Sequence, residues 1–126
     1  MHYVGVDLHQ KSSYFCILDD QGQKVMHKNI LNLESDLRTF FQDIPRPFSL
    51  AFESTYNWYF FADLAYEFTD HVSMANPYEL KAFAKRHKKN DKIDAHLIAK
   101  VLWQGFLPTA TIADQATRET RELLRS

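Results

Sequence analysis

Four acidic residues of the chain have the type and the placement that metal-dependent chemistry on phosphate esters requires. They are Asp7, Glu53, Asp91 and Asp94. Four carboxylates that converge without cations repel one another and raise one another's pKa values. Two Mg²⁺ or Mn²⁺ ions about 3.5–4 Å apart remove that repulsion and can activate a nucleophile against a phosphodiester. Carboxylate oxygens are hard ligands, which Mg²⁺ prefers. The sequence has no set of Cys or His residues at the spacing of a zinc site, so Mg²⁺ is favoured over zinc. The acids therefore predict a catalytic site that holds divalent metal.

Each of these acids also has a plainer structural explanation when it is considered alone. Asp7 could cap a turn after a strand that ends at Val6. Glu53 could be a solvated residue at a strand end. Asn90 or Asp91 could be a helix N-cap, and Asp94 could favour the positive end of that helix. The prediction depends on the four acids together, because a carboxylate inside an apolar strand is costly unless it is paired, hydrogen-bonded or bound to metal.

A basic segment surrounds the last two acids. Residues 81–92 carry six basic side chains and one acid, a local charge of +5 on a chain whose net charge is −1. Such a patch on a near-neutral domain is compatible with a phosphate-binding edge, although a solvated helix face would have the same composition. The candidate nucleic-acid contacts are Lys85, Arg86, Lys88, Lys89 and Lys92. The nearby histidines His9, His87 and His96 fit phosphate or water contacts, and equally fit ordinary surface positions.

The elements that must position these residues can be read from the hydrophobic pattern. Alternation at 2–8 puts Val4, Val6 and Leu8 on one face of a strand and Gly5 and Asp7 on the other. Two further strands, 13–18 and 24–30, follow across a turn and predict an antiparallel meander. Helical spacing then alternates with strands: a helix over about 34–44, a strand at 48–53, a helix over about 58–68, a strand at 71–75, and helices over about 78–86 and 91–104.

This order predicts an α/β fold of the RNase H-like type. We expect a mixed five-stranded sheet with helices on both faces, three antiparallel strands being followed by two parallel ones. Glu53 ends a strand of that sheet, and ligands of such sheets gather beyond the carboxyl ends of the strands. Asp91 and Asp94 are expected three positions apart on one side of a helix, with Ile98 and Val101 continuing towards the sheet.

Composition and length agree with one soluble domain. The chain has 126 residues, of which 45% are hydrophobic and 25% charged. Cys16 is the single cysteine, which rules out a disulfide within the chain and suits a reducing cytoplasm. The sequence shows no secretory signal pattern and no apolar run of the roughly 20 residues that cross a bilayer.

The end of the chain differs from the rest. We expect the catalytic domain to span 1–108, and 109–126 to begin a helical segment that leads to a C-terminal domain absent from this sequence. The basis is residues 115–125, a polar, charged stretch with only Leu123 and Leu124 to bury. A helix so poor in apolar residues rarely docks alone.

Three motifs of the chain resemble the N-terminal, RuvC-like domain of the DEDD transposases of insertion sequences. They are GVDLH with Asp7, FEST with Glu53, and KNDKIDAHLIAKVL with Asp91 and Asp94. The most specific is the Lys-x-x-Asp-x-x-Asp-Ala run, Lys88 to Ala95, because the Gly-x-Asp opening alone is weak. The resemblance covers the chain from Tyr3 to about Leu107. Tyr56-Asn57 departs from the family, which often has a small residue there, and His9-Gln10 departs from its common Ser-Lys pair.

The resemblance implies a function as well as a fold. It implies that the four acids coordinate Mg²⁺ or Mn²⁺ and that the domain takes part in phosphodiester cleavage and strand exchange of DNA at insertion-sequence ends. It also implies a structured guide RNA and a serine nucleophile on a C-terminal domain, in a cytoplasmic, nucleoid-associated protein of a prokaryotic cell with no membrane partner. A homo-oligomer, dimer or higher, is expected from the aromatic run at 58–61.

Two other functions fit the sequence. The first is a Holliday-junction resolvase-like endonuclease that is complete in one domain and shares the metal chemistry. The second is a non-catalytic module for nucleic-acid binding or oligomerisation, in which the acids serve as helix caps. Cleavage of four-way junctions by this chain separates the first from a transposase domain, and metal binding separates both from the second.

Overall fold

The computed structural model describes residues 1–53, 58–88, 93–105 and 109–110. Three strands open the chain: β1 (His2–Leu8), β2 (Ser12–Leu18) and β3 (Lys24–Leu31). They pair antiparallel in sequence order, so the predicted meander is confirmed. The sharp turn between β2 and β3 uses Gly22, whose φ of +78° favours glycine, and Asp19, whose carboxylate accepts hydrogen bonds from the backbone N–H groups of Gln21 and Gln23.

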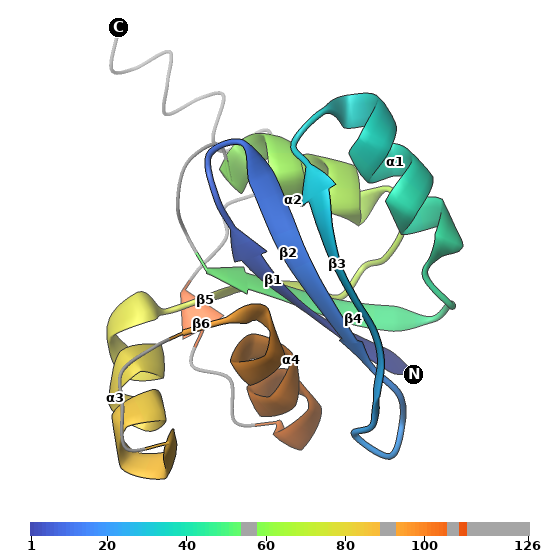
Figure 1. The fold of residues 1–126 in the computed structure, drawn as a ribbon. Helices are drawn as coiled ribbons and strands as arrows, with labels where there is room; N and C mark the ends of the chain where they lie inside the picture. The colour runs from blue at the N-terminus through green and yellow to red at the C-terminus, as the bar shows by residue number, and fades with distance from the viewer. Residues whose placement is uncertain (54–57, 89–92, 106–108, 111–126) are drawn as a thin grey trace, which may run out of the picture.

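The rest of the chain alternates helices and strands before two consecutive helices. The elements are α1 (Glu34–Asp43), β4 (Phe48–Glu53), α2 (Trp58–Tyr66), β5 (Val72–Ala75), α3 (Pro77–Lys88), α4 (Ala95–Gln104) and β6 (Thr109–Ala110). Strand β4 lies parallel to β1, and β5 lies parallel to β4. The sheet order is β3-β2-β1-β4-β5-β6 (Figure 1). The five predicted strands and their mixed, RNase H-like arrangement are confirmed.

Strand β6 was not predicted. It has two residues and pairs antiparallel with β5, so it extends the sheet by one short edge strand. A two-residue strand has no periodicity of its own, and only its pairing partner reveals it. The predicted boundary after residue 108 stays a prediction, because 111–126 lie outside the described residues.

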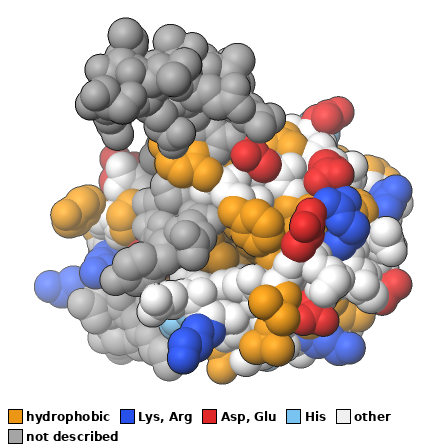
Figure 2. All heavy atoms as spheres, turned by 90° about the horizontal axis from the view of Figure 1, so that it is seen from above, with side chains coloured by type: hydrophobic (Ala, Val, Ile, Leu, Met, Phe, Trp, Pro, Cys, Tyr) orange, Lys and Arg blue, Asp and Glu red, His pale blue; other side chains and the backbone are white. Residues whose placement is uncertain are grey.

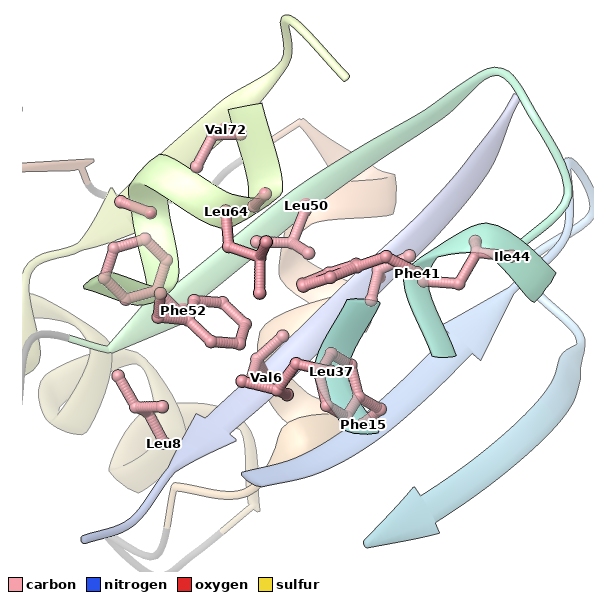
Figure 3. Packing of buried hydrophobic residues seen from close by; sticks show 14 of the residues in the cluster. Val6, Leu8, Phe15, Leu37, Phe41, Ile44, Leu50, Phe52, Leu64 and Val72 are labelled. Atoms are coloured by element: carbon pink, nitrogen blue, oxygen red, sulfur yellow. The ribbon is translucent and has the colours of Figure 1, made fainter. Parts of the chain in front are cut away.

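Helices cover both faces of the sheet, as the sequence predicts. Figure 1 shows α1 and α2 on one face and α3 and α4 on the other. The first face holds the larger core, in which Val6 and Phe15 of the meander pack with Phe41 of α1 and Phe52 of β4 (Figure 3). Phe61 of α2 belongs to the same core cluster. These five side chains are at most 1% exposed. Replacing a buried phenylalanine with alanine typically lowers the free energy of unfolding by about 3–5 kcal/mol. This core layer therefore holds in place the strands that carry the site.

The second face depends on a close approach between β1 and α4. A Cβ atom on Gly5 would lie 2.2 Å from the carbonyl oxygen of Ala95 and 2.3 Å from the backbone nitrogen of Ala99. Glycine in the central strand and alanines four apart on α4 therefore let the two backbones touch. Ile98 and Val101 of α4 are fully buried, which confirms the prediction that this helix packs its apolar stripe on the sheet.

The start of α4 corrects the sequence analysis. The helix begins at Ala95, not near Asp91, and Asp94 is its N-cap with extended backbone angles. The carboxylate of Asp94 accepts a hydrogen bond of 2.7 Å from the backbone N–H of Leu97. An N-cap aspartate satisfies an otherwise unpaired helix donor, and this capping preference outweighed the helical spacing of Asp91 and Asp94. Asp91 itself lies outside the described residues.

No helix among the described residues is both long enough and apolar enough to cross a membrane. The surface over α1 and α2 carries separate patches of hydrophobic side chains between acidic and basic ones (Figure 2). Tyr59 and Phe60 of α2 are each 42% exposed, whereas Phe61 is buried in the core. The expected homo-oligomer stays a prediction.

Candidate metal and nucleic-acid site

Asp7 and Glu53 lie side by side at the carboxyl ends of two parallel strands. Val6 of β1 is paired with Phe52 of β4, so the next residue of each strand is an acid. Val6 and Phe52 point into the core under α1 and α2. Because side chains alternate along a strand, Asp7 and Glu53 point to the opposite face, where α3 and α4 lie. The alternative that β1 ends at Val6 is wrong, since Asp7 is paired with Tyr14 inside the strand.

Asp94 is brought to the same face by the contact between Gly5 and α4. Gly5 touches Ala95, and Asp94 immediately precedes Ala95. Asp7, Asp94 and Ala95 line one groove of about 490 Å³. The three described acids thus come from two neighbouring strand ends and one helix N-terminus. The positive end of α4 favours negative charge at this place, by about 0.3–1 kcal/mol for one carboxylate.

Burial and neighbouring charges both act on Glu53. The pKa of Glu53 is raised, first by burial and then by the charge of Asp7. Lys81 and His9 oppose that shift. A carboxyl whose pKa is raised by a neighbouring carboxylate is a site where a cation would be stabilising. Lys81 of α3 therefore belongs to the surroundings of Glu53, a role that the basic run alone did not single out.

Two further contacts hold Asp7 and its strand turn. His9 Nε2 lies 3.0 Å from Asp7 Oδ2. Asn32, just after β3, donates from its side chain to the carbonyl oxygen of His9 at 2.6 Å and from its backbone to that of Lys11 at 2.9 Å. The β1–β2 turn is thereby fixed, and with it the end of β1 that carries Asp7. His9 was one of several candidate histidines, and it is paired with Asp7.

No group of three or more His, Cys, Asp or Glu side chains in the described ranges is already arranged as a metal-binding cluster. Asp7 is the shared member: it lies in one groove with Asp94 and next to Glu53 on the sheet. The donor set fits a hard divalent cation, because all three residues offer carboxylate oxygens. The charge of Asp7 contributes to the raised pKa of Glu53, and a cation between the two carboxylates would oppose that effect.

The predicted basic contacts are only partly described. Lys85 and Arg86 lie on α3 and are exposed to solvent. Lys88 is the last residue of α3, but its side chain, like Lys89 and Lys92, lies outside the described residues. Helix α3 lies on the same face of the sheet as the acids (Figure 1).

The comparison with protein families decides what kind of domain this is. The family model of the DEDD transposases of the IS110 type, described as Transposase, matches residues 4–126. The chain belongs to this transposase family. A comparison with curated proteins gives no match. The match covers all three motifs on which the resemblance was based, and it extends beyond Leu107 to the end of the sequence.

Proposed function

We propose that this transposase domain binds divalent metal, Mg²⁺ or Mn²⁺, through Asp7, Glu53 and Asp94, with Asp91 as the fourth ligand, and that it uses the metal to cleave DNA phosphodiesters. The observation that carries the proposal is the convergence of Asp7, Glu53 and Asp94 on one face of the sheet. All three lie within the residues that the family model matches, and the raised pKa of Glu53 marks a place where a cation would be stabilising.

The metal supplies Lewis acidity and a nucleophile of lowered pKa when it is bound. The chain's own residues do the positioning. The backbone contact between Gly5 and α4 sets the spacing of Asp7 and Asp94, and the hydrogen bond to Leu97 orients the Asp94 carboxylate. His9 at 3.0 Å holds the Asp7 carboxylate from the solvent side.

DNA is the proposed substrate, and Lys85, Arg86, Lys88, Lys89 and Lys92 are its proposed backbone contacts. Their support is charge: the basic residues cluster on and after α3, and Lys81 of the same helix acts on Glu53. We also propose strand exchange at insertion-sequence ends and a structured guide RNA, on the basis of family membership. Homo-oligomerisation is proposed from the aromatic run at 58–61.

Binding of labelled duplex DNA in Ca²⁺ tests the substrate. The slope of log affinity against log salt should approach −0.9 for each phosphate contact. The double variant Lys85→Gln, Arg86→Gln should reduce its magnitude by about 1–2. The matched control Lys11→Gln, Lys28→Gln removes two lysines that lie on other elements, the β1–β2 turn and β3. If the salt slopes of the two double variants and of the unchanged chain are equal, Lys85 and Arg86 of α3 are not DNA contacts.

A four-way DNA junction with Mg²⁺ separates the two nuclease functions. Clean symmetric cleavage by this chain supports a resolvase-like enzyme complete in one domain. Binding without cleavage supports a transposase domain whose chemistry needs a further domain. If the chain neither binds nor cleaves the junction at any concentration of divalent metal, both nuclease functions are contradicted. The non-catalytic module is then the function that remains.

A further inference from the structure

The groove that contains Asp7 and Asp94 has a second wall that the proposed metal site does not use. Beyond the acids it is lined by Tyr14 of β2 and by Lys24 and His27 of β3, with His96 of α4 on the other side. We call Tyr14, Lys24 and His27 the hairpin wall. A volume of about 490 Å³ lies within the range of about 300–1,000 Å³ that is typical of small-ligand sites. None of the hairpin-wall residues lies in the basic run at 81–92.

Aromatic rings form a row along this wall. The ring centroids of His9 and Tyr14 are 5.7 Å apart, and those of Tyr14 and His27 are 6.4 Å apart. Tyr14 is 41% exposed, although its neighbours on the same face of β2, Cys16 and Leu18, are buried under α4. Tyr14 therefore lies just beyond the cover of α4 and presents a large apolar surface next to two acids. Exposed aromatic rings of this kind are the stacking surfaces of proteins that bind single-stranded nucleic acid.

A bulge in the β2–β3 hairpin adds positive charge to the same wall. Ile17 is paired with Met26, but Leu18 is paired with Lys24, so the register shifts between them. Without that shift Leu18 would face Val25. The bulge turns Lys24 onto the face that carries Leu18 and α4, and there Lys24 lines the groove. Lys24 also counteracts the rise that burial causes in the pKa of the Cys16 thiol, whereas Asp94 adds to that rise.

We propose that the hairpin wall binds one unpaired nucleotide of a nucleic-acid strand, with its base against Tyr14 and its phosphate at Lys24. The strand would then enter the acidic site from the β2–β3 side, opposite the basic residues of α3. This inference rests on the proposed function for its position in the reaction, but the binding itself does not need the metal. DNA and RNA share the base and the phosphate that the wall would recognise, and the experiment separates them.

The test uses the double variant Asp7→Asn, Asp94→Asn as its starting protein, so that a failure of the metal site does not affect the result. Fluorescence anisotropy measures binding of labelled single-stranded DNA and RNA oligonucleotides. Tyr14→Ser should weaken binding at least about fivefold, and Tyr14→Phe should stay within about twofold, because the ring is retained. The matched control is Tyr66→Ser, which removes a tyrosine of similar exposure, 42%, from α2 on the opposite face.

Two further comparisons make the assignment specific. Tyr14→Ser should not change the binding of an oligonucleotide with abasic sites, because such an oligonucleotide has no base to stack on the Tyr14 ring. Lys24→Gln should reduce the magnitude of the salt slope by about 0.7, the value for one phosphate of a single strand, whereas Lys28→Gln should not. Lys28 lies on the same strand but lines a different groove, with Asp36 and Asp43 of α1.

The proposal is supported if Tyr14→Ser acts on intact oligonucleotides alone and Lys24→Gln changes the slope. A larger effect with DNA assigns the wall to the substrate, and a larger effect with RNA assigns it to an RNA partner. It is overturned if Tyr14→Ser and Tyr66→Ser weaken binding alike. It is also overturned if only Lys24→Gln has an effect, which would indicate a phosphate contact without a nucleotide site. Thermal melting of each variant shows that the comparison is between folded proteins.

Discussion

Asp94 has two roles at the scale of a single residue, and a substitution can separate them. Its carboxylate accepts the N-cap hydrogen bond from Leu97 and also lines the groove with Asp7. Asparagine caps helices about as well as aspartate, whereas alanine does not. The sequence alone does not separate the two roles, because an aspartate just before an apolar helix fits an N-cap and a metal ligand equally well.

We predict that Asp94→Asn leaves the free energy of unfolding within about 0.5 kcal/mol, while Asp94→Ala lowers it by about 1 kcal/mol. Both variants should lose divalent-metal binding, because both remove the charge. Urea unfolding in EDTA measures the first effect, and calorimetric titration measures the second. Full metal binding by Asp94→Asn would mean that the residue is only a cap.

Glu53 gives a prediction with a definite pH dependence. Its pKa is raised in the folded protein, so folding favours the protonated carboxyl and the ionised form costs stability. That cost is absent well below pH 4.5, the ordinary pKa of a glutamate, because the carboxyl is then protonated in both states. It is complete at a pH above the raised pKa of the folded protein. In EDTA, Glu53→Gln should therefore raise the melting temperature at pH 7 and leave it nearly unchanged at pH 3.5.

The control for Glu53 has the opposite sign. Arg38 donates hydrogen bonds to Glu67 and lowers the pKa of that exposed carboxyl. Glu67→Gln should therefore leave the melting temperature at pH 7 unchanged or slightly lower. A fall in melting temperature for Glu53→Gln at pH 7 would show that the ionised carboxylate is stabilised in the fold, contrary to its proximity to Asp7.

At the scale of elements, the packing of α4 on β1 decides whether the acids meet. Sequence patterning predicted both elements, the face on which Asp7 lies and the buried stripe of α4, because periodicities of 2 and 3.6 are directly visible in apolar residues. It did not predict the approach of the two backbones at Gly5 or the late start of α4, because both depend on contacts between distant segments. The hairpin wall was missed for the same reason, because the bulge at Leu18 is what turns Lys24 into the groove that Tyr14 also lines.

Gly5→Ala tests that packing. The added methyl group would lie 2.2 Å from the Ala95 carbonyl oxygen, so α4 must move away from β1. We expect a loss of about 3 kcal/mol or more in the free energy of unfolding, since the obstacle is backbone and cannot rotate away. Chemical denaturation measures it, and metal binding should be lost with it because Asp94 moves.

Gly105→Ala is the matched control for this change. Gly105 ends α4 with a φ of +80°, and nothing lies within 4 Å of the place that a Cβ would take. Its cost is limited to the left-handed backbone conformation, about 1–2 kcal/mol, and metal binding should be retained. Equal costs for the two substitutions would show that β1 and α4 do not meet as closely as described.

At the scale of the whole molecule, one sheet presents the acids between two flanks of different character. The flank of α3 carries exposed Lys85 and Arg86, and the hairpin wall carries Tyr14 and Lys24. The large core under α1 and α2 lies on the opposite face (Figure 3), so substitutions at the site leave that layer intact. The division between a stability face and a chemistry face follows from the alternation of side chains along β1 and β4.

Metal binding by the unmodified chain tests the central claim most directly. Calorimetric titration with Mn²⁺ should show binding, and Asp7→Asn should weaken it by at least about tenfold. The reason is that Asp7 lies between the other two proposed ligands, next to Glu53 on the sheet and in one groove with Asp94. His71→Gln, a change on the loop between α2 and β5, should leave it unaffected. Binding that is unchanged in Asp7→Asn, or no binding at about 10 mM Mn²⁺ with or without DNA, would contradict a metal site at these acids.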